Sequence, residues 1–233
     1  MERILNVAEL ELVGLGEVKE VFKTKDLNLL DRVIKLSGFS FRKTFPTRRV
    51  NSVYFDTIKM DLLTQSLEGN RDRKKIRVRW YGEEKKEYDA TLEIKNKEGA
   101  VSWKNLYEKQ VTVNPTETSW DNFLKYDSDK LHLKNTFKTY LPTSIVSYKR
   151  DYYESKNKKI RVTIDQDLSS YQQMSRFKVN FTHYKNHSSL VIMEIKTSYE
   201  EDKLLTRVLQ DFPFSAKRFS KYCESLLPQT YYQ

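Results

Sequence analysis

The residues best suited to chemistry are the closely spaced cations of residues 68–82, EGNRDRKKIRVRWYG. Alternate residues of an extended chain point to opposite faces, so from residue 73 onward one face would hold mainly cations and the other mainly apolar side chains. The cationic row is Lys75, Arg77 and Arg79, and the apolar row is Ile76, Val78 and Trp80. Fixed cations in such a row suit an anion with several oxygen atoms, because guanidinium groups bind phosphate oxygens two at a time.

The same alternation of charged and apolar residues recurs in five other segments. The charged residues involved carry both signs, and they are Glu17 and Lys19, Glu93 and Lys95, Arg150, Arg161 and Asp165, and Glu194 and Lys196. One interpretation is the solvent face of an antiparallel sheet that packs its apolar face on helices. The other is a closed barrel with the charged face inside and the apolar face outside, under helices.

The residue types favour the barrel. A solvent face accepts Ser, Thr, Asn and Gln freely, whereas these positions are dominated by Arg, Lys and Glu. An interior filled with unpaired cations would be costly, so this interpretation requires a polyanion and a metal ion to complete the pairing.

The elements that must position these residues are mostly extended. Strands are predicted over residues 16–23, 50–56, 75–82, 88–96, 107–113, 145–154, 159–165 and 190–197. Helical spacing appears in DLNLLDRVIKLSG, with Asp26 as N-cap and Gly38 as the stop, and in EEDKLLTRVLQ and SAKRFSKYCESLL. Residues 114–143 are predicted to be a short helical insertion. Without a linker, residues 1–233 are expected to form a single domain.

Composition narrows the function classes. The chain has 233 residues, a net charge of +10 and a pI near 9.4, which favours an anionic partner. No apolar run approaches the roughly 20 residues of a membrane span, and the N-terminus lacks a signal-peptide layout, so a cytoplasmic location is expected. The single cysteine, Cys223, excludes an internal disulfide.

Several motifs occur together in a family-specific order. They are RRVNSVYFDT, SLEGNRDRKKIRVRWYG, LEIKNK, SYKRDYYES followed by IRVTID, then VIMEIKT and RFSKYC. The set resembles the vacuolar transporter chaperone (VTC) domain of the triphosphate tunnel metalloenzymes, a CYTH-like superfamily, over about residues 17–223. The resemblance implies an α+β, mostly antiparallel fold with a closed eight-stranded barrel forming a tunnel and helices outside. It also implies ATP-dependent synthesis of inorganic polyphosphate.

The resemblance also implies roles for individual residues. Those expected to grip phosphate oxygens are Lys19, Arg77, Arg79, Lys95, Arg150, Arg161, Arg218 and Lys221, with Arg77, Arg79 and Lys221 assigned to ATP. Glu194 of MEIK matches the metal-binding glutamate of the family. Leu15 and Glu20 depart from the family pattern, which has Arg and an aromatic residue there, and this leaves the tunnel entrance in question.

Mn²⁺ or Mg²⁺ is the expected cofactor, because both ions prefer oxygen ligands and keep water or phosphate at their other positions. Glu17 and Glu93 are candidate additional ligands, with charge balance to neighbouring Lys or Arg as the alternative for each. Asp165 is a weaker candidate, since it lies near a strand end.

Three function classes remain open from the sequence. They are a metal-dependent polyphosphate polymerase using ATP, a hydrolase of triphosphate or nucleoside triphosphate with the same fold, and a non-catalytic module that binds polyphosphate. Glutamates among the cations would repel a nucleic-acid backbone, so no specific nucleic acid is expected. Any coupling to polymer export would require a separate membrane protein.

Overall fold

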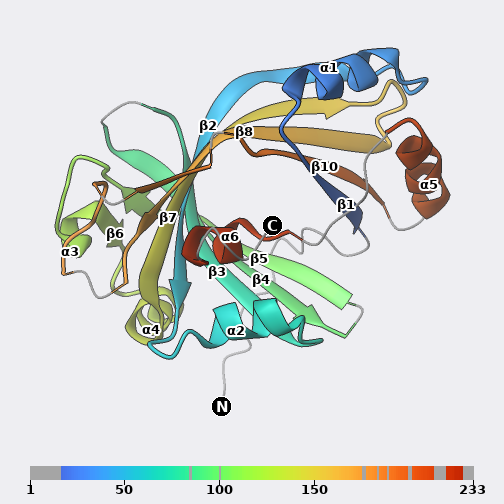
Figure 1. Cartoon of the computed structure of the whole chain (residues 1–233). Coiled ribbons are helices and arrows are strands. Elements are labelled where there is room, and N and C mark those ends of the chain that lie inside the picture. The colour runs from blue at the N-terminus through green and yellow to red at the C-terminus, as the bar shows by residue number, and fades with distance from the viewer. Residues whose placement is uncertain are drawn as a thin grey trace. The chain divides into compact units, whose positions relative to one another are not determined.

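The computed structural model describes residues 17–83, 86–99, 101–174, 177–182, 184–187, 189–198, 201–212 and 219–227. The strands are β1 (Glu17–Thr24), β2 (Arg42–Asp56), β3 (Arg73–Tyr81), β4 (Tyr88–Glu98), β5 (Val101–Val113), β6 (Leu124–Tyr126), β7 (Leu141–Glu154), β8 (Ile160–Gln172), β9 (Tyr184–His187) and β10 (Val191–Ser198) (Figure 1). The helices are α1 (Leu27–Leu36), α2 (Asp61–Glu68), α3 (Trp120–Phe123), α4 (Leu131–Thr139), α5 (Asp202–Gln210) and α6 (Lys221–Leu226).

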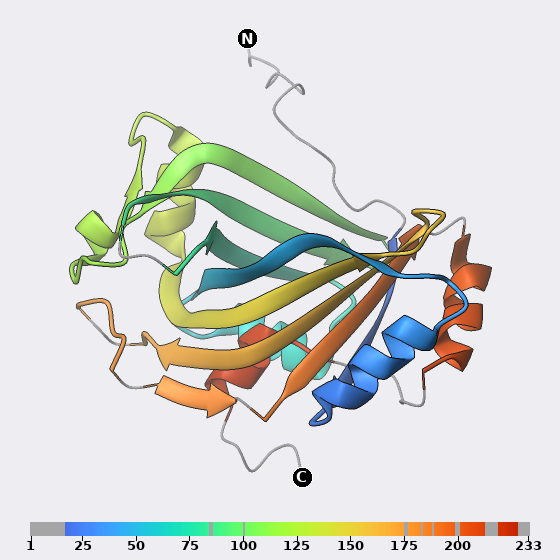
Figure 2. The same ribbon diagram turned by 90° about the horizontal axis from the view of Figure 1, so that it is seen from above.

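The described strands form one ten-stranded, mostly antiparallel sheet with the order β1-β10-β8-β7-β2-β3-β4-β5-β6, and β9 pairs with β8 (Figure 2). The α+β class is confirmed. The closed eight-stranded barrel is not supported, because the path of hydrogen-bonded strands described here ends at β1 and β6. Two strands, β6 and β9, were not predicted, since three and four residues are too few to show an alternating pattern.

The chain divides into two compact units, each assembled from separate segments. The first contains residues 52–145 and 172–181, and the second contains residues 16–51, 146–171 and 182–233. Strands β2, β7 and β8 therefore contribute to both units. In the segment predicted to be a helical insertion, α3 and α4 are separated by the short strand β6.

Helix α1 begins as the sequence predicts. The Asp26 side chain accepts a hydrogen bond of 2.9 Å from the backbone N–H of Leu29, which satisfies one of the free donors in the first turn. The helix ends at Leu36, and Ser37, with an extended backbone, is the C-terminal cap immediately before Gly38, the predicted stop.

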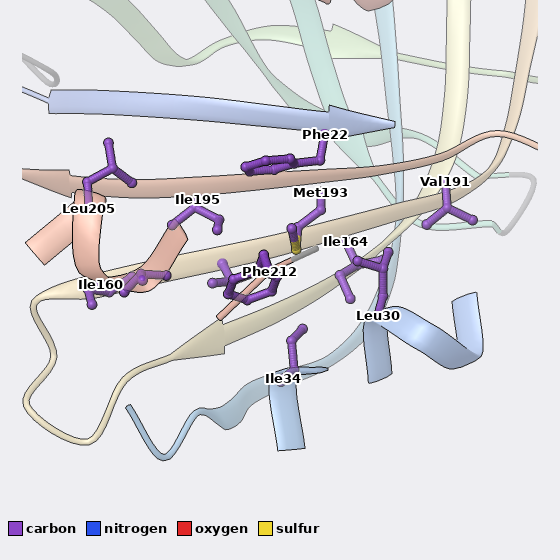
Figure 3. Close-up of a cluster of buried hydrophobic side chains, with 12 residues drawn as sticks. Phe22, Leu30, Ile34, Ile160, Ile164, Val191, Met193, Ile195, Leu205 and Phe212 are labelled. Carbon is purple, nitrogen blue, oxygen red and sulfur yellow. The ribbon is translucent and has the colours of Figure 1, made fainter. Parts of the chain in front are cut away.

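The core of the second unit lies between the apolar face of β1, β8 and β10 and the helices α1 and α5. Alternate strand residues pack there on helix residues, and the members shown in Figure 3 include Phe22, Ile160, Ile164, Met193, Ile195, Leu30, Ile34, Leu205 and Phe212. The predicted period-two pattern of these strands is therefore confirmed on its apolar side.

In the first unit the apolar row of β3 is buried as predicted. Ile76, Val78 and Trp80 are all nearly inaccessible, and Trp80 meets the ring of Phe123 edge-on with centroids 5.9 Å apart. The opposite face of β3 is thereby left for Arg77 and Arg79.

Two leucines of α1 test how far stability depends on this core. Leu30 is fully buried, whereas Leu36 on the same helix is 84% exposed. We expect Leu30→Ala to lower the free energy of unfolding by about 2–5 kcal/mol and Leu36→Ala to change it by less than about 0.5 kcal/mol. Chemical denaturation measures both, and equal losses would contradict the packing of α1 on the sheet.

Candidate functional site

Glu93 is the centre of a buried group of charges in the first unit, which we call the Glu93 cluster. Its carboxylate accepts hydrogen bonds from Arg77 Nε at 2.7 Å and Arg77 Nη2 at 2.5 Å. Arg79 Nη1 lies 3.1 Å and Lys104 Nζ 3.4 Å from the same carboxylate. Tyr54 completes the cluster, since its hydroxyl accepts a hydrogen bond of 3.3 Å from Arg77 Nη1. Register pairing of Arg77 with Glu93 across β3 and β4 produces this arrangement.

The charges of the Glu93 cluster are strongly coupled. Burial alone would raise the pKa of Glu93, but Arg77, Arg79 and Lys104 outweigh burial and hold this pKa at about 2. Burial lowers the pKa of Lys104, and the two arginines lower it further against the attraction of Glu93. Three cations thus surround one carboxylate, and the cluster retains an excess of positive charge.

Asp165 is the centre of a second group, the Asp165 cluster, which lies entirely in the second unit. Its fully buried carboxylate accepts hydrogen bonds from Arg150 Nε at 2.5 Å and Arg150 Nη2 at 2.7 Å. Lys221 Nζ lies 2.5 Å from the second carboxylate oxygen and 3.7 Å from Glu194 Oε1. The Lys221 ammonium also lies 4.8 Å from the centroid of the Tyr148 ring.

Mutual attraction keeps this cluster ionised despite its burial. For Asp165, burial raises the pKa but Arg150 and Lys221 lower it by more, so the net shift is downward. For Lys221, burial lowers the pKa, whereas Asp165 and Glu194 raise it above its ordinary value. Lys221 is therefore a fixed, permanently charged group at neutral pH.

Both clusters contain buried polar atoms that have no hydrogen-bond partner among the described residues. These atoms are Arg79 Nε in the first unit, and Tyr148 Oη and Thr163 Oγ1 in the second. Thr163 pairs in register with Glu194 and is two residues from Asp165 along β8. Unsatisfied buried polar atoms are costly and uncommon, and six further ones among the described residues lie outside the two clusters.

Further cations continue the rows from each cluster. On β3, β4 and β5, Lys75 pairs in register with Lys95, and Lys95 with Lys104. On β10 and β8, Lys196 pairs in register with Arg161. This pair lies two residues along each strand from the pair of Glu194 and Thr163. The register places cations of neighbouring strands directly opposite one another, which is unfavourable unless anions are nearby.

Helix α6 carries Lys221, and contacts at both its ends fix its position. Ser220 caps its start, accepting from the Cys223 N–H at 3.4 Å. At its end, Lys185 Nζ donates to the carbonyl oxygens of Glu224 at 3.3 Å and Leu227 at 2.6 Å. A cation at a helix C-terminus satisfies the last carbonyls and opposes the helix dipole. Lys185 of β9 therefore acts as a positioning residue for Lys221.

His187 lies in β9 and is buried. Its Nε2 is 3.2 Å from the hydroxyl of Ser170, and its Nδ1 is 3.8 Å from Glu224. Burial and the nearby Lys185 lower the pKa of His187 to about 4, so the ring is neutral at pH 7. His187 thus packs beside α6 and belongs to neither cluster.

The structure brings six of the predicted site residues into the two clusters as charged groups: Arg77, Arg79, Glu93, Arg150, Glu194 and Lys221. Lys95 and Arg161 lie at exposed positions on the same strands. Lys19 pairs in register with Lys196 and Glu17 with Ser198, but their side chains are not described. Arg218 lies outside the described residues.

Sequence reasoning missed the importance of Asp165, Lys104 and Tyr54. Asp165 was ranked low because of its place near a strand end, yet β8 extends to Gln172 and buries it completely. The alternation that places it on the same face as Arg161 and Thr163 was the available signal. Glu93 was a candidate metal ligand, and its carboxylate forms ion pairs with Arg77, Arg79 and Lys104.

Glu194 has the donor chemistry that a divalent ion needs. Its carboxylate is 14% exposed, and its 3.7 Å ion pair with Lys221 is loose compared with the contacts of Glu93 and Asp165. Among the described side chains, no three carboxylates, histidines or cysteines lie close enough together to hold a metal. Mg²⁺ and Mn²⁺ are commonly held by one or two carboxylates together with substrate phosphates, and Glu194 fits that arrangement.

Comparison with known families gives a single assignment. The family model of the VTC domain matches residues 20–228 of the sequence, nearly the whole chain. The chain therefore belongs to the VTC domain family. Membership supports a polyphosphate-related function.

Solved structures are similar to this chain at low sequence identity. A suggested adenylate cyclase from Vibrio parahaemolyticus is 16% identical, with a TM-score of 0.50 and coverage of 91% of this chain and 98% of the other. A protein from Pyrococcus horikoshii OT3 is 13% identical, with a TM-score of 0.48 and coverage of 88% and 96%. No curated protein matches the sequence. Among the described residues, no helix has the length and apolar character needed to cross a membrane.

The depressed pKa of Glu93 predicts an acid-sensitive contribution to stability. The pKa of Glu93 is about 2 in the folded chain and 4.5 ordinarily. Its carboxylate therefore stabilises the fold fully above pH 4.5, and this contribution disappears as the pH falls toward 2. We expect a loss on the order of 3 kcal/mol over that range in the wild type, and a flatter profile in Glu93→Gln. Denaturation between pH 2 and 6 measures it.

Glu87→Gln is the matched control, because Glu87 is half exposed and pairs with Lys125 at the surface. Its profile should follow that of the wild type. A Glu93→Gln profile as steep as the wild-type profile would show that Glu93 is not the titrating group.

Proposed function

We propose that this VTC domain is a polyphosphate polymerase that transfers the γ-phosphoryl group of ATP to the end of a growing polyphosphate chain. The observation that supports the proposal most is the combination, in each cluster, of fixed cations with buried donors that lack a partner among the described residues: Arg79 Nε, Tyr148 Oη and Thr163 Oγ1. Such donors suit the many oxygens of a polyphosphate.

Phosphoryl transfer depends mainly on positioning and on neutralising charge. In the proposed reaction, a terminal oxygen of the chain forms a new bond to the γ-phosphorus, the bond to the bridging oxygen of ADP breaks, and ADP leaves with the electron pair. Arg150 and Lys221 are held rigidly by Asp165, and Arg77 and Arg79 by Glu93. Their geometry is set before any phosphate arrives, so little reorganisation is needed during transfer.

Polymerisation is favoured over hydrolysis by the state of the carboxylates. A hydrolase must position a water molecule and usually deprotonate it. Asp165 and Glu93 are fully engaged with cations, and neither cluster contains a histidine among its described members. The terminal phosphate of a chain is already an anion at neutral pH and needs no general base.

Glu194 is the residue we assign to a Mn²⁺ or Mg²⁺ ion, with Glu17 as a candidate second ligand. Such an ion, when bound, neutralises charge on the transferred phosphate. We assign Glu93 to charge balance rather than to the metal. Lys19, Lys95, Arg161 and Arg218 are proposed to contact further phosphates. We also propose that the domain works in the cytoplasm and that export of the polymer requires a separate membrane protein.

Product analysis tests the reaction. Purified protein with ATP and Mn²⁺ should yield ADP and a phosphate polymer, and added short polyphosphate should increase the yield because the chain end is held near the γ-phosphate. Gel staining for polymer and a free-phosphate assay on the same sample give the result. Free phosphate in equal amount to ADP, without polymer, would establish a hydrolase. No ADP with any metal would leave a binding module.

Replacing the proposed metal ligand gives a separate prediction. Glu194→Gln keeps the shape of the side chain and removes its charge, so turnover at limiting Mn²⁺ should fall at least about a hundredfold while inorganic triphosphate still binds. Glu201→Gln is the control, since Glu201 pairs with Lys159 at the surface of the same unit. Turnover of Glu194→Gln equal to that of the control would remove Glu194 from the metal role.

A further inference from the structure

Cations and aromatic rings alternate in an unbroken row that leads from the Asp165 cluster to the exposed start of β2, within the second unit. Lys221 lies 4.8 Å from the Tyr148 ring, and Arg150 lies 5.2 Å from Tyr148 and 5.9 Å from Tyr152. Arg48 in turn lies 5.8 Å from Tyr152 and 4.6 Å from Phe45. The row therefore begins at a buried lysine and ends at an exposed arginine.

Arg48 differs from the other charged residues near it. It forms no hydrogen bond or ion pair with any described residue, and only the rings of Phe45 and Tyr152 hold it. These two rings meet edge to face at 81° with centroids 5.7 Å apart, so they form a rigid support. Stacking fixes the guanidinium plane and leaves its N–H edges free to donate.

Neighbouring cations of β2 are used within the protein. Lys43 Nζ lies 2.5 Å from Asp151 and donates to Thr47, and Arg49 donates to the carbonyl of Asp167 at 3.4 Å. The first residues of β2, from Arg42 to Arg48, are all exposed. Arg48 is thus a fixed cation at the surface.

We propose that Arg48, supported by Phe45 and Tyr152, is an outer subsite for the phosphate groups of a long polyphosphate chain whose inner groups are held at the Asp165 cluster. Tyr148 and Tyr152 are four residues apart on β7, which corresponds to about 13 Å. We expect the three phosphate groups of a triphosphate to be engaged by Lys221 and Arg150, so that only a longer chain continues past Tyr152 to Arg48. The subsite therefore distinguishes long chains from short ones. This inference rests on the proposed function only in that the Asp165 cluster binds phosphates.

The geometry favours a phosphate chain over a nucleobase as the occupant. Arg48 covers one side of the Phe45 ring and Tyr152 meets that ring edge-on, so the rings already have protein partners. The groups left available are the guanidinium donors, which recognise phosphate oxygens.

Binding of inorganic polyphosphates of different lengths to the full chain tests the inference. Affinity is measured for triphosphate and for chains of about one hundred phosphates, by calorimetric titration without ATP. Arg48→Gln should weaken long-chain binding about three- to tenfold and leave triphosphate binding unchanged. The dependence of long-chain affinity on salt should also become shallower by about one counterion.

Lys43→Gln is the matched control, because it removes one positive charge from the same exposed strand segment. Its long-chain affinity should equal that of the wild type. An equal loss of long-chain affinity in both variants would show that the effect comes from surface charge in general, and it would overturn the inference. Unchanged long-chain affinity in Arg48→Gln would also overturn the inference, and so would an equal loss of triphosphate affinity in that variant. Phe45→Leu with weakened ATP binding but normal polyphosphate binding would reveal a site for the base instead.

The inference and the proposed function fail in different ways. A wild-type chain that binds long polyphosphate through Arg48 but makes no polymer from ATP would end the proposed function and support the subsite. A wild-type chain that does not bind long polyphosphate more tightly than triphosphate would overturn the subsite, whatever its activity with ATP.

Discussion

The structure depends on two carboxylates that are buried among cations. Glu93 and Asp165 each hold two or three Arg or Lys side chains in place, and without these carboxylates the inner cations would repel one another in a poorly solvated environment. The sequence suggested that only a polyanion and a metal could offset so much positive charge. Part of the compensation is internal, and it leaves the cations fixed but still able to bind an anion.

This arrangement separates the positioning of charge from the binding of ligand. The carboxylates engage Arg77, Arg150 and Lys221 on one side, and unsatisfied donors such as Tyr148 Oη and Arg79 Nε remain nearby. Buried groups without partners lower stability, and at both clusters they lie beside fixed cations, which is the combination on which the proposed function rests. In the same way, Lys185 holds the C-terminal end of α6 and so fixes the position of Lys221.

Strands with one apolar and one charged face contribute to the hydrophobic core and to the charged clusters at the same time. The residues of β3 that build the core, Ile76, Val78 and Trp80, alternate with those that face Glu93. In the second unit, Met193 and Ile195 of β10 pack under α1 and α5, while Glu194 between them reaches Lys221. Stability and function are therefore encoded at alternating positions, and a shift in register by one residue would destroy both.

Local patterns in the sequence predicted eight of the ten described strands, the faces of β3, β8 and β10, and the start of α1 at Asp26, because alternation and capping are local properties of the chain. The sequence also identified Arg77, Arg79, Arg150, Glu194 and Lys221. The partners of these residues became known from the folded structure: Lys104 at Glu93, Lys221 at Asp165, and Arg48 on Tyr152. Those contacts join residues far apart in the sequence, and they depend on strand register and on the docking of α6. The same holds for the sheet, whose described strands do not close, since closure is decided by pairing between edge strands that local patterns do not specify.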